Sequence, residues 1–180
     1  PDQQVKLIKR MDNRIYFYSE VTKHTVLALH EHLHAAAQWA LQSCALPTKA
    51  RVYLYINSGG GDVYAGFSAM DHIRGCRVPV VTIADGYVAS AATFMLLGGT
   101  RRYGMPSTNI LIHQLSAEFW GKFSELEFEL VNTRKLMDTI RRLYERHTKL
   151  TGADLDRMLS GELMLTCEES MQHGFITRIL

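Results

Sequence analysis

Ser90 stands out among the hydroxyl side chains of this 180-residue sequence because of the residues that surround it. A β-branched run over 78–83 predicts a strand, Asp85-Gly86 follows it, and the small apolar run over 89–97 predicts a buried helix. A hydroxyl at a helix start faces free N–H groups that favour negative charge, so it could act as a nucleophile. A serine at this place is also a common N-cap, and the segment alone leaves both interpretations open.

His113 is a candidate base for such a nucleophile. It follows the apolar run over 109–112, which predicts a strand, and a lone histidine there could equally be a core or surface side chain. The combination carries more weight, because serine needs an adjacent base to react near neutral pH and histidine has a suitable pKa. The ends of strands in α/β sheets are also where sites assemble.

Three glycines, Gly59, Gly60 and Gly61, follow the predicted strand over 51–56. Acyl transfer passes through an oxyanion that backbone N–H groups can stabilise, and glycine lets the backbone turn an N–H into a site. An ordinary glycine-rich turn is an alternative. A phosphate-binding loop is another, although neither a GKS/GKT ending nor the G-x-G-x-x-G pattern is present.

The remaining elements alternate between strand and helix, which predicts one α/β domain over 1–180 with mostly parallel pairing. The range 122–149 carries apolar residues at helical spacing for about seven turns, so we expect a helix that projects or packs against another subunit. The other expected strands are 14–18, a short one near Met164, and 175–179, and the other expected helices are 25–46, 63–73, 154–159 and 168–173.

Composition excludes several classes of protein. The formal net charge is +2, which is unlike a nucleic-acid-binding protein, and the pairs Arg101-Arg102 and Arg141-Arg142 are interpreted as solvated faces. Three scattered cysteines suggest neither a disulfide framework nor a cysteine–zinc site. No apolar run reaches the roughly 18 residues of a membrane span, and the polar start over 1–10 does not resemble a signal peptide. We therefore expect a cytoplasmic or organelle-matrix protein without cofactor or membrane partner.

A second motif competes for the chemistry. His30, Glu31 and His34 match H-E-x-x-H within a predicted helix, where two histidines one turn apart can bind zinc and the glutamate can activate water. The same helix also carries His24 and His32, so a chance match on a partly exposed helix face is the alternative, and we expect no metal.

Taken in order, these segments resemble the proteolytic subunit of the Clp proteases over about residues 13–179. The resemblance rests on YLYINS with its glycines (53–61), DGYVASA (85–91), LIHQ (111–114), the long helix 122–149, and the closing segment 168–176. It implies a ClpP/crotonase-like spiral of ββα units with a projecting "handle" helix.

The resemblance also implies roles for single residues. Ser90 would be the nucleophile and His113 the general base, and the N–H groups of Gly61 and Ala91 would bind the oxyanion. Gly60 would contact substrate. The position of the family's aspartate is occupied by Glu162, which is one methylene longer, and Asp154 or Asp156 could substitute for it.

The function implied is ATP-independent cleavage of peptides and unfolded polypeptides inside two stacked heptameric rings, with an AAA+ unfoldase as partner. Tyr55 matches a strand that lines the docking pocket, whereas Gly75 stands where the family keeps a large apolar side chain. Two alternatives remain: a structural ring subunit that pairs with an active paralogue, and another enzyme of this fold, such as an acyl-CoA hydratase or a signal-peptide peptidase.

Overall fold

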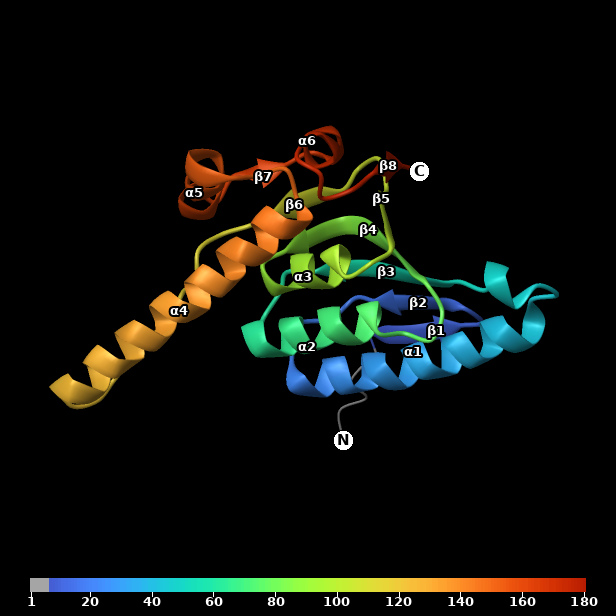
Figure 1. Cartoon of the computed structure of the whole chain (residues 1–180), viewed down its shortest axis with the longest axis horizontal. Helices are drawn as coiled ribbons and strands as arrows, with labels where there is room; N and C mark the ends of the chain where they lie inside the picture. The colour runs from blue at the N-terminus through green and yellow to red at the C-terminus, as the bar shows by residue number, and fades with distance from the viewer. Residues whose placement is uncertain (1–6) are drawn as a thin grey trace.

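A mostly parallel sheet forms the centre of the molecule, as the computed structural model of residues 7–180 shows (Figure 1). Its strand order is β1-β2-β3-β4-β5-β8, and β6 pairs with both β4 and β7. The pairs β1–β2 and β6–β7 are antiparallel and the others are parallel. The strands are β1 (Ile8–Met11), β2 (Arg14–Phe17), β3 (Val52–Ser58), β4 (Val80–Ala89), β5 (Arg101–Gly104), β6 (Asn109–Leu111), β7 (Met164–Leu165) and β8 (Arg178–Ile179). The α/β prediction is confirmed.

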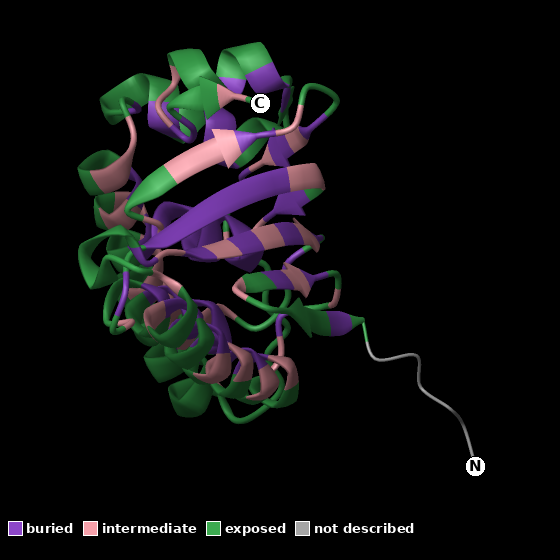
Figure 2. Cartoon of the chain, turned by 90° about the vertical axis from the view of Figure 1, so that its right-hand side faces the viewer, coloured by how far each residue is buried: buried purple, intermediate pink, exposed green. Residues whose placement is uncertain are grey.

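Three helices pack along one face of this sheet (Figure 1). Along β3 the side chains of Val52, Leu54 and Ile56 are buried, whereas Tyr53 and Tyr55 on the opposite face are half-buried, which is the period-2 pattern of a strand covered mainly on one side. Figure 2 shows this banding, with the buried strands at the centre. The three helices on this face are α1 (Lys23–Ser43), α2 (Val63–Arg74) and α3 (Ala91–Leu97). The other helices are α4 (Phe123–His147), α5 (Gly152–Gly161) and α6 (Cys167–Gln172), and a 3₁₀ turn lies at Pro47–Lys49.

Side-chain caps fix where several helices begin. The Thr22 hydroxyl accepts from the N–H of Thr25 at the start of α1, and the Asp62 carboxylate accepts from the N–H of Ala65 at 2.6 Å at the start of α2. Thr166 forms a reciprocal capping box with Glu169 at the start of α6. Each such cap contributes about 1 kcal/mol and sets the direction in which the chain leaves the preceding strand or turn.

Strand β4 changes partner halfway along its length. Up to Ala84 it pairs with β5, and from Tyr87 onwards it pairs with β6. Gly86 lies between the two halves with φ = +80°, a conformation that disfavours side chains, and its N–H donates to the Thr108 hydroxyl. The expectation that the strand ends before Asp85-Gly86 is wrong, because this glycine bends the strand and lets it continue to Ala89.

Helix α4 projects from the body of the molecule (Figure 1). Of its 25 residues only Ile140 and Tyr144, near its C-terminal end, are buried. The Tyr144 hydroxyl lies 2.7 Å from the Thr93 hydroxyl, and Thr93 donates to the carbonyl oxygen of Ser90 at 2.6 Å. The base of the projecting helix is therefore joined to the segment that carries the candidate nucleophile.

Other boundaries differ from the sequence-based expectations. Arg101 and Arg102 belong to β5, and Arg102 is half-buried because its guanidinium donates to the carbonyl oxygen of His147 at 2.7 Å, so the interpretation of this pair as a solvated face is wrong. Strand β1 was missed among the charged residues near the N-terminus, and residues 1–6 of that polar start lie outside the described part of the chain. Within residues 7–180 no helix is both long and apolar enough to cross a membrane.

We predict that Tyr144→Phe lowers the free energy of unfolding by about 1–2 kcal/mol, because it removes one buried hydrogen bond and leaves the ring packing intact. The matched control is Tyr64→Phe, since Tyr64 is 66% exposed and its change should stay within about 0.5 kcal/mol. Urea denaturation followed by circular dichroism measures both values. Equal values for the two variants would contradict a structural role for the Tyr144–Thr93 contact.

Candidate active site

Ser90 occupies the junction between β4 and α3 in a strained backbone conformation. Its φ of +55° and ψ of −129° are rare for a residue with a side chain, and its hydroxyl makes no capping hydrogen bond. The N–H of Ser90 donates to the carbonyl oxygen of Leu111 at the end of β6, at 3.0 Å. The conformation therefore leaves the hydroxyl free at the start of a helix, so the plain N-cap interpretation does not describe Ser90.

His113 follows β6, two residues beyond the strand's last residue. Backbone hydrogen bonds before and after His113 fix its position. The carbonyl oxygen of Leu111 accepts from the N–H of Ser90, and the N–H of Gln114 donates to the carbonyl oxygen of Leu159 in α5 at 2.7 Å. The Nδ1 atom of His113 lies 2.6 Å from the carbonyl oxygen of Gln114. Because a carbonyl only accepts, Nδ1 carries a proton. In the neutral imidazole Nε2 then keeps its lone pair, which is the tautomer that a general base needs.

The glycine run lies directly against Ser90. Gly60 has φ = +97°, and a Cβ placed on it would lie 2.6 Å from the Ser90 Cβ and 2.7 Å from the Ala89 carbonyl oxygen. Its N–H donates to the Ser58 hydroxyl and its carbonyl oxygen accepts from Val21, so both groups are already used inside the chain. Only glycine allows this approach of the two segments.

The expected oxyanion donors are the N–H groups of Gly61 and Ala91. Gly61 has φ = +144°, and its β-bridge to Val21 uses the Gly60 carbonyl and the Asp62 N–H rather than its own N–H. Ala91 is the first residue of α3, where an N–H has no partner within the helix. Neither N–H makes a hydrogen bond to any residue of the described chain. Gly61 borders the cavity beside Ser90, whereas Ala91 is fully buried behind it.

Ser90, His113 and Gly61 border one small cavity of about 60 Å³. Sequence reasoning missed its other wall, which includes Ile140 and Tyr144 from α4. The helical spacing of apolar residues marks both as the inner face of α4, but that spacing does not indicate what the face packs against. A hydroxyl, an imidazole and backbone N–H groups around one cavity have the composition required for acyl transfer.

The acidic candidates lie away from His113. Glu162 is the exposed residue that ends α5, in a left-handed conformation with φ = +48°. Asp156 is ion-paired with Arg141, and Asp154 is bonded to Arg157. Within residues 7–180 none of the three carboxylates is hydrogen-bonded to His113, whose Nδ1 is held by the Gln114 carbonyl instead.

The register of β6 and β7 nevertheless favours Glu162 over the two aspartates. Ile110 pairs with Leu165 and Leu111 with Met164, so each step forward along β6 is a step back along β7. Two further steps in the same register would place Glu162 opposite His113.

The histidines of the competing motif lie on α1. The His30 ring stacks on His72 of α2 with centroids 3.5 Å apart, and burial followed by the charge of His72 lowers the pKa of His30. Glu31 is exposed. In the part of the chain that the structure describes, no three His, Cys, Asp or Glu side chains gather in a way that could hold a metal ion, so the zinc alternative lacks a third ligand.

Known proteins share the sequence pattern and the fold of this chain. The Clp protease family model matches residues 2–180. The chain belongs to the Clp protease family. It is 34% identical over 131 residues to an ATP-dependent Clp protease proteolytic subunit of Deinococcus radiodurans, covering 72% of this chain and 64% of that protein. It is 38% identical over 134 residues to the proteolytic subunit 2 of Treponema denticola, covering 71% and 65%.

The alignments thus span just under two thirds of the length of these curated Clp relatives. A solved structure, that of a ClpP1 point mutant from Listeria monocytogenes, superposes with a TM-score of 0.77 at 22% identity and covers 91% of this chain and 88% of that one. The expected ClpP-like fold with its projecting helix is therefore confirmed.

We predict that Gly60→Ala slows the reaction of Ser90 with a fluorophosphonate by about 100-fold, because the added methyl group must displace Ser90 and small misplacements of a reacting group have effects of this size. Gly59→Ala is the matched control, since nothing lies within 4 Å of a Cβ at Gly59. Mass spectrometry of the tagged peptide over time measures both rates. Unchanged labelling of Gly60→Ala would show that this close approach does not hold the serine in place.

Proposed function

We propose that this chain is the proteolytic subunit of a Clp-type serine peptidase that cleaves peptides and unfolded polypeptides. One observation carries the proposal: Ser90 is held at a positive φ with an unused hydroxyl, and it shares a cavity with a histidine whose Nε2 is free to accept a proton. A strained, uncapped serine is a cost to folding that a structural role does not explain. The names of the curated relatives support the same conclusion.

In the proposed mechanism the Ser90 oxygen attacks the scissile carbonyl carbon while Nε2 of His113 takes the hydroxyl proton. The oxyanion then lies between the N–H groups of Gly61 and Ala91, at the start of α3, where free N–H groups favour negative charge. His113 returns the proton to the leaving amine, which gives an acyl-enzyme that water hydrolyses by the same steps. The Gln114 carbonyl holds the imidazole before substrate binds, and Glu162 is the acid that would stabilise the imidazolium if β7 extended by two residues.

The surface of α4 supports an assembly of rings. Five large apolar side chains in the first turns of this helix are exposed, and helices in water do not expose such a set without a partner. They are Phe123, Leu126, Phe128, Leu130 and Val131. We propose that these side chains pack against α4 of a second ring, so that two heptameric rings enclose the sites.

We also propose that an AAA+ unfoldase supplies unfolded substrate. Tyr55, which stacks on Tyr16 with ring centroids 4.8 Å apart, belongs to the surface that would receive the unfoldase.

We predict that Ser90→Ala reduces cleavage of a fluorogenic peptide by about a million-fold, in practice to background, because the nucleophile is lost. Ser107→Ala, on an exposed turn, is the control and should cleave at the wild-type rate. Both variants should sediment as the same large assembly, and EDTA should leave wild-type cleavage unchanged. A folded protein should be degraded only when an ATPase partner and ATP are added.

The alternative of a structural ring subunit is favoured by one observation, the absence of an acidic partner on His113 within the described residues. The same experiment separates the two. A wild-type chain that assembles but cleaves no faster than Ser90→Ala would support the structural subunit, and loss of cleavage in EDTA would instead support a metal-dependent site.

A further inference from the structure

Two adjoining cavities, separate from the one that Ser90 borders, lie where three helices end beside β5. The first, of about 600 Å³, is bordered by the ends of α2 and α4 and by the connection from α3 to β5. The second, of about 420 Å³, lies between the end of α4 and the segment that joins α6 to β8. They share Arg102, His147 and Thr177, and we call them together the basic cleft.

The charges around the basic cleft are of one sign. Five permanently positive residues border it, and neither cavity has an aspartate or glutamate in its wall. They are Arg74, Arg101, Arg102, Arg146 and Lys149. Among residues 7–180 the two ion pairs lie elsewhere, between Arg141 and Asp156 and between Arg157 and Asp154. Since the net charge of the whole chain is only +2, this concentration of positive charge is local.

Helix ends explain only part of this concentration. Helices α2, α3 and α4 end at Arg74, Leu97 and His147, and a helix C-terminus carries about half a negative charge. Arg102 serves one of these ends directly, because its guanidinium donates to the His147 carbonyl oxygen at 2.7 Å. Three such ends leave most of the five positive charges without compensation.

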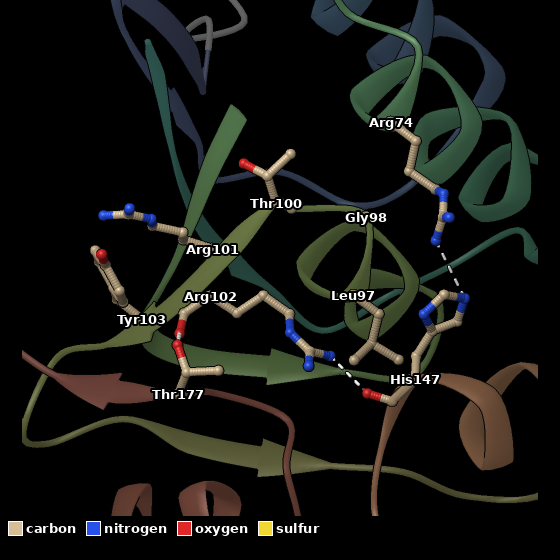
Figure 3. Close-up of a pocket in the computed structure, with 10 residues that line it drawn as sticks. Arg74, Leu97, Gly98, Thr100, Arg101, Arg102, Tyr103, His147 and Thr177 are labelled. Atoms are coloured by element: carbon tan, nitrogen blue, oxygen red, sulfur yellow. Dashed lines mark hydrogen bonds between the residues drawn. The ribbon is translucent and has the colours of Figure 1, made fainter. Parts of the chain in front are cut away.

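Two of these side chains are also directed at the same residue. Figure 3 shows Arg74 and Arg102 both pointing toward His147, whereas the guanidinium of Arg101, on the same strand as Arg102, points away. Arg74 lies 3.2 Å from Nε2 of His147, and because a guanidinium only donates, the imidazole is neutral and accepts. Burial, followed by the charges of Arg74, Arg102 and Arg146, lowers the pKa of His147. Like charges held this close are stabilised by an anion between them.

We propose that the basic cleft binds an oxyanion of the phosphate class that carries two or more negative charges. The planar guanidinium groups of Arg74 and Arg102 match the geometry of phosphate oxygens, and the volume of the first cavity accommodates a diphosphate. The ligand would lie outside the cavity that Ser90 borders, and its binding does not depend on the peptidase mechanism. Free pyrophosphate and the diphosphate of a nucleotide present the same chemistry.

Isothermal titration calorimetry of the full chain with pyrophosphate, in a low-salt buffer without phosphate, tests the proposal. We expect saturable binding, and Arg74→Gln should raise the dissociation constant about tenfold because one charge-assisted contact is lost. Arg74 is exposed, so this variant should fold normally, which its unfolding temperature checks. Arg142→Gln is the matched control, because it removes the same charge from an exposed arginine that borders neither cavity, and it should bind as the wild type does.

A parallel titration with ADP distinguishes the two sources. Equal affinity for ADP and pyrophosphate would indicate that the cleft contacts the phosphates alone. Tighter binding of ADP would indicate that it also contacts the nucleoside. Two results would overturn the proposal: no binding of pyrophosphate up to about 5 mM, or equal weakening by Arg74→Gln and Arg142→Gln, which would indicate a diffuse effect of net charge.

Discussion

The positive φ of Ser90 is the constraint on which the arrangement of the site depends. Such a conformation costs about 1–3 kcal/mol and persists only where neighbouring segments leave no alternative. Here Leu111 holds the Ser90 N–H, Thr93 holds the Ser90 carbonyl, and Gly60 packs against the Ser90 Cβ. Two distant segments thus meet at Ser90: one leads to His113 and the other contains Gly61. Thr93, one turn further along the same segment, joins Ser90 to Tyr144 of α4.

The change of partner along β4 brings these segments together. If β4 ended at Ala84, beside β5, Ser90 would have no strand next to it to accept its N–H. The bend at Gly86 carries the strand past β5 and onto β6, so that His113 follows directly from the strand that holds Ser90. The antiparallel addition of β7 then directs the end of α5 toward the same corner, which explains why Glu162 is the nearest acid in register although it makes no contact with His113.

The sequence was informative where local chemistry decides the outcome. The strand that runs into the glycines, the helix that follows them and the long helix α4 each follow from short-range patterns, and all three predictions were confirmed. It was less informative where tertiary contacts decide. The sequence around Gly86 predicts a turn, and the pairing with β6 is what makes this glycine a bend within a strand. The sequence predicts an exposed charge at Arg102, and its hydrogen bond to the end of α4, 45 residues later, is what makes the side chain half-buried.

Within the site, residue identity predicted Ser90 and His113 and the glycines near them, because few residue types can perform those steps. The cavity wall from α4 could not be predicted, since helical spacing marks an inner face without naming its neighbour. The partner of His113 could not be predicted either. A backbone carbonyl leaves no signature in the sequence, and the Gln114 carbonyl takes the place that pattern matching assigns to a carboxylate.

The most direct test is a crystal structure of the chain after reaction with a fluorophosphonate, in which phosphorus represents the tetrahedral carbon and its free oxygen the oxyanion. We predict a bond from phosphorus to the Ser90 oxygen, a free oxygen within hydrogen-bond distance of the N–H groups of Gly61 and Ala91, and a positive φ at Ser90. A free oxygen directed away from both N–H groups, or an adduct on another residue, would contradict the account of this site.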